Sequence, residues 1–121
     1  MAGVPKKLRQ QDVVAFALGL PETEKRSHMG RPDLRVCGKI FATLPENGLT
    51  VNVKSPPFTL EALVRADPET FESIWNGQML GVALARVEPA LLKSLLIEAW
   101  RNRAPKRLAN TEIRPARKGK G

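Results

Sequence analysis

The feature that most constrains this fold is a turn signal set between two alternating runs of residues. Pro45-Glu46-Asn47-Gly48 contains an Asn-Gly pair, which accepts the positive φ angles that tight hairpin turns require. Residues 39–44 lead into the turn, and residues 49–54 leave it with apolar residues at every second position. The pattern predicts two antiparallel strands with one buried face. On the second strand, the side chains predicted to be buried are Leu49, Val51 and Val53.

Strand patterns continue upstream of this hairpin, and helical patterns flank them. The whole stretch 22–54 reads as β structure, in which Leu34 and Val36 alternate with charged neighbours and Gly38 marks a tight turn. Apolar residues at helical spacing predict helices over residues 9–19, over residues 58–66, and from Pro89 to the residue before Pro105.

The segment between the last two of these helices predicts one more helix and one more strand. Asp67 can serve as an N-cap and Pro68 suits a first helical position, so we expect a short helix here that ends at Asn76-Gly77. The residues on its apolar side would be Phe71, Ile74 and Trp75. Residues 79–87 are apolar and predict an internal strand. Adjacent antiparallel strands with helices before and after them indicate an α+β fold.

Length and composition predict one domain. We expect a chain of 121 residues to form a single domain over residues 1–108, followed by a basic tail over residues 109–121 that has no periodicity and is expected to be disordered. Cys37 is the single cysteine, so no intramolecular disulfide can form. No run of about 18 apolar residues and no signal-type segment occurs, which favours a soluble cytoplasmic protein with no membrane contact.

The net charge of +8 is distributed unevenly along the chain. Residues 1–100 carry 12 basic and 11 acidic residues, whereas residues 101–121 carry 8 basic residues and one acidic residue. This asymmetry favours contact with polyanions, DNA among them. A tail that only improves solubility would carry the same charge, so this alternative stays open.

Catalytic and metal-binding patterns are missing from the sequence. His28 and Cys37 are the single histidine and cysteine, and they lie on neighbouring predicted β segments. No helix N-terminus is expected at Cys37 to activate its thiol, so a buried apolar role is the more usual one for it. A structural zinc site takes four Cys/His ligands, and neither GxGxxG nor GxxxxGKS/T occurs. We therefore expect a non-catalytic protein without metal or cofactor.

Residues 28–44 form the most distinctive segment of the chain. The segment reads His28-Met29-Gly30-Arg31-Pro32, then a strand, then Gly38-Lys39-Ile40-Phe41-Ala42. Other motifs in order are Leu18-Gly19-Leu20-Pro21-Glu22, Val51-Asn52-Val53-Lys54, Glu98-Ala99-Trp100 and Ala104-Pro105-Lys106-Arg107-Leu108. Over about residues 10–108 this order and spacing resembles the MmcQ/YjbR family. The chain departs from the family pattern at Met29, where an aromatic residue is common, and in residues 81–86, which lack a usual tryptophan.

The resemblance implies a curved antiparallel β-sheet flanked by helices, in a double-wing arrangement. Members of the family are usually labelled DNA-binding, so the resemblance also implies a nucleic-acid-binding module. The basic residues that would contact phosphates, with little base specificity, are Arg31, Arg35, Lys39, Lys54, Arg103, Lys106 and Arg107. A basic patch would form if Arg35, Asn52 and Lys54 shared the polar sheet face, with Phe41 as a nearby stacking surface.

Three other interpretations stay open. The basic sheet residues could form a solvated β face on which Arg31 and Lys39 make structural hydrogen bonds. The chain could be a protein-interaction or chaperone-like adaptor that docks a partner at Pro56-Pro57 or at residues 79–84. A small ligand could bind in a pocket, which would lie under His28, Arg35 and Trp75.

Overall fold

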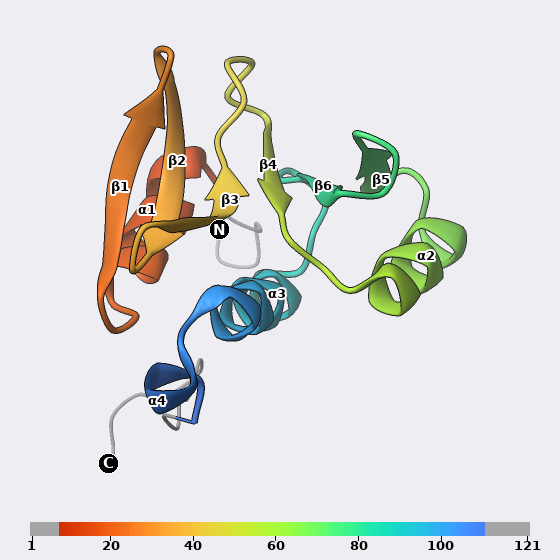
Figure 1. Cartoon of the computed structure of the whole chain (residues 1–121). Coiled ribbons are helices and arrows are strands. Elements are labelled where there is room, and N and C mark those ends of the chain that lie inside the picture. The colour runs from red at the N-terminus through yellow and green to blue at the C-terminus, as the bar shows by residue number, and fades with distance from the viewer. Residues whose placement is uncertain (1–7, 111–121) are drawn as a thin grey trace.

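The computed structural model describes residues 8–110, which form one mixed domain of helices and a single sheet (Figure 1). The elements in chain order are α1 (Gln10–Leu18), β1 (Thr23–His28), β2 (Arg31–Val36), β3 (Lys39–Thr43), β4 (Thr50–Val53), α2 (Pro57–Ala66), β5 (Phe71–Ile74), β6 (Met79–Ala83), α3 (Pro89–Arg103) and α4 (Lys106–Ala109). The strand order is β1-β2-β3-β4-β6-β5, and each neighbouring pair is antiparallel. The predicted α+β fold with a curved antiparallel sheet is therefore confirmed.

Two-residue turns with positive φ connect the first three strands. Met29 and Gly30 have φ angles of 54° and 80°, and Cys37 and Gly38 have φ angles of 51° and 83°. Paired positive φ angles match the right-handed twist of the flanking strands. At the longer β3–β4 turn, the Asn47 side-chain oxygen accepts a hydrogen bond from the Leu49 N–H at 2.7 Å.

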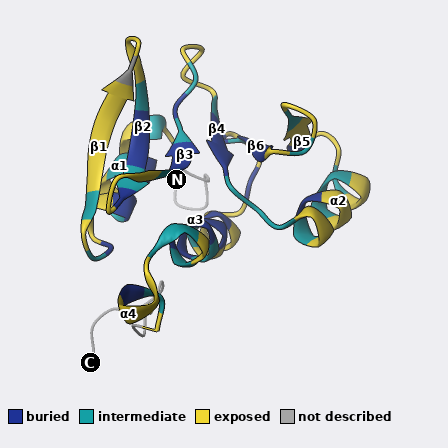
Figure 2. Ribbon diagram, in the orientation of Figure 1, coloured by how far each residue is buried: buried dark blue, intermediate teal, exposed yellow. Residues whose placement is uncertain are grey.

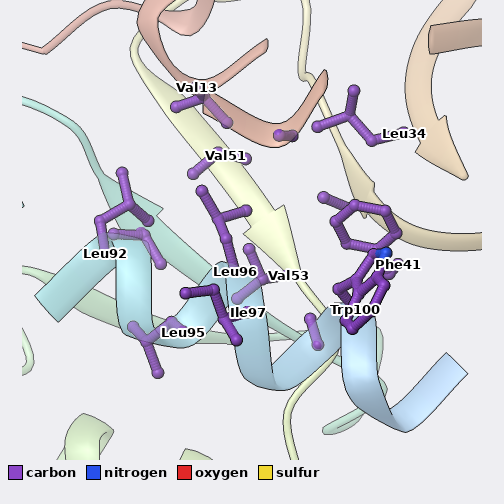
Figure 3. Packing of buried hydrophobic residues seen from close by; sticks show 14 of the residues in the cluster. Val13, Leu34, Phe41, Val51, Val53, Leu92, Leu95, Leu96, Ile97 and Trp100 are labelled. Carbon is purple, nitrogen blue, oxygen red and sulfur yellow. The ribbon is translucent and has the colours of Figure 1, made fainter. Parts of the chain in front are cut away.

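One face of the sheet packs against helices and forms the core (Figures 2 and 3). The sheet contributes Leu34, Val36, Phe41, Val51, Val53, Leu80 and Val82, each fully buried. The helix α3 lies against the middle of the sheet and places Trp100 beneath Phe41 (Figure 3). Trp100 Nε1 donates a hydrogen bond to the Pro21 carbonyl at 3.0 Å, which satisfies the indole N–H inside the core.

Helix α1 is fixed to the central hairpin by one side chain. Gln10 Nε2 donates hydrogen bonds to the carbonyl oxygens of Pro45 and Thr50 at 2.8 and 2.9 Å. At the start of the helix the Asp12 carboxylate accepts from the Arg9 N–H at 2.9 Å. Both contacts satisfy backbone groups that no ladder or helix bond uses.

The segment 71–74 is a strand, and the predicted short helix there was wrong. Phe71 pairs with Val82 and Ile74 with Met79 in the β5–β6 ladder. Asn76-Gly77, interpreted above as a helix end, is instead part of the turn between these strands, with φ angles of 55° and 83°. Strand β6 lies between β4 and β5, as predicted for an internal strand, and it is buried, so residues 79–84 do not offer the docking surface that the adaptor interpretation proposed.

Three further side chains differ from their predicted burial. Leu49 precedes β4 in the turn and is 68% exposed, whereas Asn52, predicted on a polar face, is 6% exposed. Cys37 is exposed because it occupies the β2–β3 turn, so its predicted apolar burial was wrong. The predicted tail over residues 109–121 lies outside the described residues from position 111 onward. Within residues 8–110, no helix is long and apolar enough to cross a membrane.

Candidate anion-binding cavity

A polar row crosses the sheet on the face opposite the core. The strand register pairs Asp33 with Thr43, Thr43 with Asn52, and Asn52 with Gly81. Asn52 Nδ2 donates a hydrogen bond to Thr43 Oγ1 at 3.1 Å. The side chain of Ile74 lies over Gly81, so that a Cβ atom at Gly81 would be only 2.9 Å from Ile74 Cγ1. Asp33 and Asn52 are both almost fully buried, although they lie on the face opposite the core.

A cavity of about 450 Å³ opens on this face. It is lined by β2, β3 and the segment after it, the residue after β4, the β5–β6 turn, the start of β6 and the last residue of α3. These elements come from four separate parts of the chain, and the curvature of the sheet brings them together. The cavity is large enough for a small ligand.

Three of the predicted basic residues line this cavity. Arg31 stands at the start of β2, Lys54 directly after β4, and Arg103 at the end of α3. Lys54 Nζ donates to the Gln78 carbonyl at 3.4 Å, and none of the three is paired with a carboxylate within the described part of the chain. Their positive charges are thus available to an anion.

A smaller cavity of about 310 Å³ adjoins the first and shares Lys54 and Arg103 with it. Ser55 and Asn102 complete its polar lining. Ser55 Oγ and Arg103 Nε are both buried and lack a hydrogen-bond partner within residues 8–110. Buried donors without partners are uncommon and mark positions at which a bound group can supply the missing acceptor.

Arg35 is not available to an external anion, in contrast to the prediction. Its Nε and an Nη donate to the two carboxylate oxygens of Asp33 at 2.8 and 3.1 Å. The Asp33 side chain is 3% exposed, and Arg35 neutralises its charge inside the cavity wall. The hydrogen bond to Asp33 also raises the pKa of Arg35. The predicted patch of Arg35, Asn52 and Lys54 does not form, because Asn52 is buried and bonded to Thr43.

An exposed aromatic side chain lines the cavity. Trp75 is 56% exposed and occupies the β5–β6 turn with a φ angle of 53°. Ile40, Leu44 and Met79 add apolar surface to the lining. The lining of the cavity therefore combines apolar and aromatic side chains with three cationic ones. Phe41, the predicted stacking residue, is buried in the core instead.

Lys39 and Lys106 lie away from the cavity. Lys39 is exposed at the start of β3, paired with Val36 at the opposite end of the β2–β3 hairpin from Arg31. Lys106 is exposed at the start of α4. Neither residue is brought together with Arg31, Lys54 and Arg103 by the fold.

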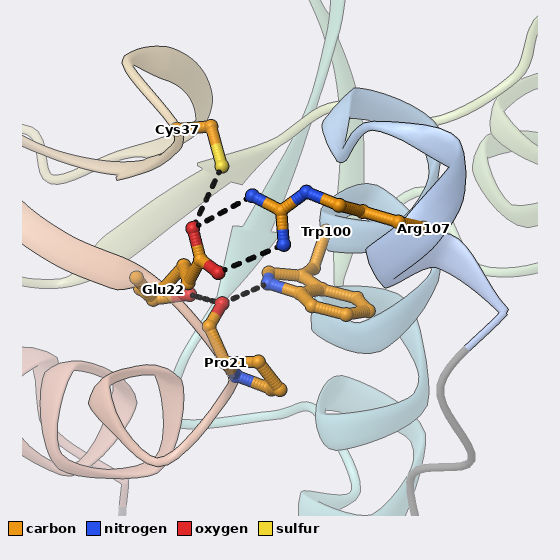
Figure 4. A network of polar contacts seen from close by, with 6 residues as sticks. Pro21, Glu22, Cys37, Trp100 and Arg107 are labelled. Atoms are coloured by element: carbon orange, nitrogen blue, oxygen red, sulfur yellow. Dashed lines mark hydrogen bonds and ion pairs between the residues drawn. The ribbon is translucent and has the colours of Figure 1, made fainter.

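Arg107 has a structural contact in place of the predicted phosphate contact (Figure 4). Its guanidinium donates to both carboxylate oxygens of Glu22 at 3.0 and 3.2 Å, which holds α4 against the turn between α1 and β1. Hydrogen bonds from Arg107 and then from Cys37 lower the pKa of Glu22. Desolvation, followed by the neighbouring Glu22, raises the pKa of Cys37. The network is therefore a structural clasp that holds α4 to the α1–β1 turn, with the exposed Cys37 thiol bonded to it.

Within residues 8–110 the fold does not bring His28 and Cys37 together, and no cluster suited to metal binding occurs. In the β1–β2 register His28 pairs with Arg31 while Val36, next to Cys37, pairs with Thr23, so His28 and Cys37 stand at opposite ends of the hairpin. No group of three or more His, Cys, Asp or Glu side chains in residues 8–110 could hold a metal ion.

Fold and cavity together define a class: a small α+β domain with one helix-covered sheet face and one open face that bears a cationic cavity. The sequence model of the YjbR family matches residues 18–102. The chain belongs to the YjbR family. The crystal structure of the Deinococcus radiodurans protein DR2400, a DUF419 domain, is similar with a TM-score of 0.69 and 20% identity, over 82% of this chain and 80% of that chain. That likeness shows the shared fold, and no curated protein matches the sequence.

The sequence points to Trp75 as part of a small-ligand pocket but predicts it on a helix, and no pattern identifies Ser55. The second Asn-Gly pair, at residues 76–77, was the available signal: interpreted as a hairpin turn, it places Trp75 at the tip of two strands. For the proposed small-ligand pocket, Trp75 lies where it was expected, whereas Arg35 is committed to Asp33.

Proposed function

We propose that this chain is a non-catalytic nucleic-acid-binding module that contacts phosphates through its cationic cavity. The observation that carries the proposal is that Arg31, Lys54 and Arg103, from three separate elements, line one cavity. Among the described residues that line the two adjoining cavities, the single acid is Asp33, and Arg35 neutralises it. Such a surface contacts phosphates with little sequence specificity.

The proposal separates the folded domain from the C-terminal charge. Residues 111–121 carry four basic residues and one acidic residue, so they also attract polyanions. Binding of mixed-sequence DNA to the full chain and to a chain ending at Asn110 should be measured by fluorescence anisotropy across a salt series. We expect weaker but persistent binding after truncation, with a shallower salt dependence. If truncation abolishes binding, the folded domain is not the part of the chain that binds DNA.

The cavity is tested by a matched pair of charge reversals in the full chain. Arg31→Glu/Lys54→Glu should reduce affinity strongly and lower the salt slope by about two, because each phosphate contact contributes about one. Lys25→Glu/Arg65→Glu changes the net charge equally at exposed positions on β1 and α2, outside the cavity. Equal losses in the two variants would show that net charge alone drives binding.

The second candidate function is a protein-interaction adaptor, and an apolar groove favours it. A cavity of about 460 Å³ lies between α1 and α3, lined by Val13, Phe16, Leu92 and Leu96, with Lys93 Nζ 5.6 Å from the centre of the Phe16 ring. A groove of this kind suits an apolar segment of a partner. This candidate gains if neither form of the chain binds nucleic acid below about 0.1 mM at moderate salt.

A further inference from the structure

We propose that the cavity on the open sheet face holds one unpaired nucleotide, with its base against Trp75 and its phosphate between Lys54, Ser55 and Arg103. The inference deepens the proposed function by naming the part of a nucleic acid that is recognised. Where the ligand is a nucleic-acid strand, the inference rests on the proposed function. A free nucleotide offers the same chemistry, so the experiment below separates the two sources.

The base site follows from the size and lining of the cavity. A volume of about 450 Å³ falls within the range of small-ligand sites. Trp75 supplies an exposed aromatic side chain to the lining, and Ile40 and Met79 supply apolar surface. Aromatic side chains stack on any base whose face is accessible. Inside a blunt duplex each base face is covered by its neighbours, so the cavity selects an unpaired base.

The phosphate site follows from the unsatisfied donors in the adjoining cavity. Ser55 Oγ and Arg103 Nε are buried without a hydrogen-bond partner within the described residues, and Lys54 borders both cavities. One phosphate can accept from the serine hydroxyl and the guanidinium while it lies beside the ammonium group. Hydrogen bonds from charged donors to phosphate are among the strongest in proteins. A buried donor that gains such an acceptor also loses its desolvation penalty.

The ion pair between Asp33 and Arg35 neutralises the negative charge in the cavity wall that would repel an anion. An unpaired carboxylate at Asp33 would repel a phosphate, because its side chain lies in the cavity wall. Arg35 binds both of its oxygens, so the wall is neutral at that point. Arg31, which also lines the cavity, then adds to the positive potential around the ligand.

The test is a titration of the full chain, in which Trp75 is exposed and Trp100 is buried, followed by tryptophan fluorescence and, for both strand forms and every variant, by the fluorescence anisotropy of a labelled strand. The probes are single-stranded oligodeoxyadenylate, a blunt dA·dT duplex of the same length, adenosine monophosphate and adenosine. Trp75→Asn removes the ring while keeping a residue that tolerates positive φ at this turn. Phe58→Asn removes an aromatic ring that is 84% exposed on α2, outside the cavity, and serves as the matched control.

We expect the single strand to quench Trp75 and to bind at least about tenfold tighter than the duplex. Trp75→Asn should lower the affinity for the single strand about tenfold and change the affinity for the duplex little. Phe58→Asn should leave both affinities unchanged. Ser55→Ala and Arg103→Gln should weaken the binding of adenosine monophosphate but not the binding of adenosine, which lacks the phosphate.

The remaining outcomes separate this inference from the proposed function. If single strand and duplex bind equally and Trp75→Asn changes neither, the chain binds nucleic acid but the nucleotide site is refuted. If neither strand form binds while adenosine monophosphate still quenches Trp75 in a phosphate-dependent way, the proposed function fails and the site takes a free nucleotide. If no probe quenches Trp75, the inference is overturned for both sources.

Discussion

Gly81 tests whether the open face of the sheet is as closely packed as the structure shows. An alanine Cβ at this position would lie 2.9 Å from Ile74 Cγ1, 3.1 Å from Ile74 Cδ1 and 3.4 Å from Asn52 Oδ1. Carbon atoms in contact prefer about 3.5–4.0 Å, so Ile74 must move. We therefore predict that Gly81→Ala destabilises the domain, even though the backbone at Gly81 has no positive φ angle.

The magnitude is the balance of two terms. Overpacking a close site costs about 1–3 kcal/mol. Replacing glycine by alanine at a compatible backbone returns about 0.4–1 kcal/mol by restricting the unfolded chain. The expected net loss is about 1–2 kcal/mol, and about 1 kcal/mol corresponds to roughly 4–8 °C in Tm for a domain of this size. Urea unfolding followed by the fluorescence of buried Trp100 measures this loss directly.

A double-mutant cycle with Ile74→Ala isolates the cause. Ile74→Ala removes both side-chain atoms that would clash, so Gly81→Ala in that background should be neutral or stabilise by about 0.4–1 kcal/mol. An equal loss from Gly81→Ala in both backgrounds would refute the argument, because the cost would then not come from Ile74. A changed m-value would indicate an altered unfolded or native state and would disqualify the comparison.

Further predictions concern the core tryptophan and the clasp on α4. Trp100→Phe removes the hydrogen bond to the Pro21 carbonyl and part of a fully buried ring, so calorimetry should show a loss of about 1–3 kcal/mol; an unchanged Tm would contradict this. Arg107→Gln should reduce stability at neutral pH. Because the pKa of Glu22 is lowered in the fold, the difference from wild type should shrink as the pH falls below the ordinary glutamate pKa of 4.5; a pH-independent difference would exclude the ion pair as its cause. Alkylation of Cys37 by iodoacetamide near pH 8 should be slower than that of a free thiol, and Glu22→Gln should accelerate it by lowering the pKa of Cys37, whereas an unchanged rate would show that desolvation alone controls the thiol.

Local patterns predicted most of the fold. The Asn47-Gly48 turn and the alternation around it identified the central hairpin, and helical spacing located α1, α2 and α3. The strand β5 could not be recognised in this way, because four residues are too few to establish a period. Phe71 and Ile74 fit one helix face equally well, and only pairing with β6 decides between the two structures.

The sequence identified the charged residues of the candidate site but did not show that the fold brings them together. Arg31, Lys54 and Arg103 were identified, yet their convergence depends on the curvature of the sheet and the position of α3. The Asp33–Arg35 pair was accessible to reasoning, since residues two apart share a strand face. The partner of Arg107 lies 85 positions away at Glu22, and no local pattern connects the two.

The strand β1 has a consequence for how copies of this protein meet. It forms one edge of the sheet, and its sequence places the exposed charges of Glu24, Lys25 and Arg26 in succession. Charged side chains on an edge oppose its extension by a strand from another molecule. At the opposite edge, β5 is only four residues long. The hydrogen-bonding capacity left at both margins is therefore poorly suited to a continuous intermolecular sheet, which protects the protein against edge-to-edge aggregation.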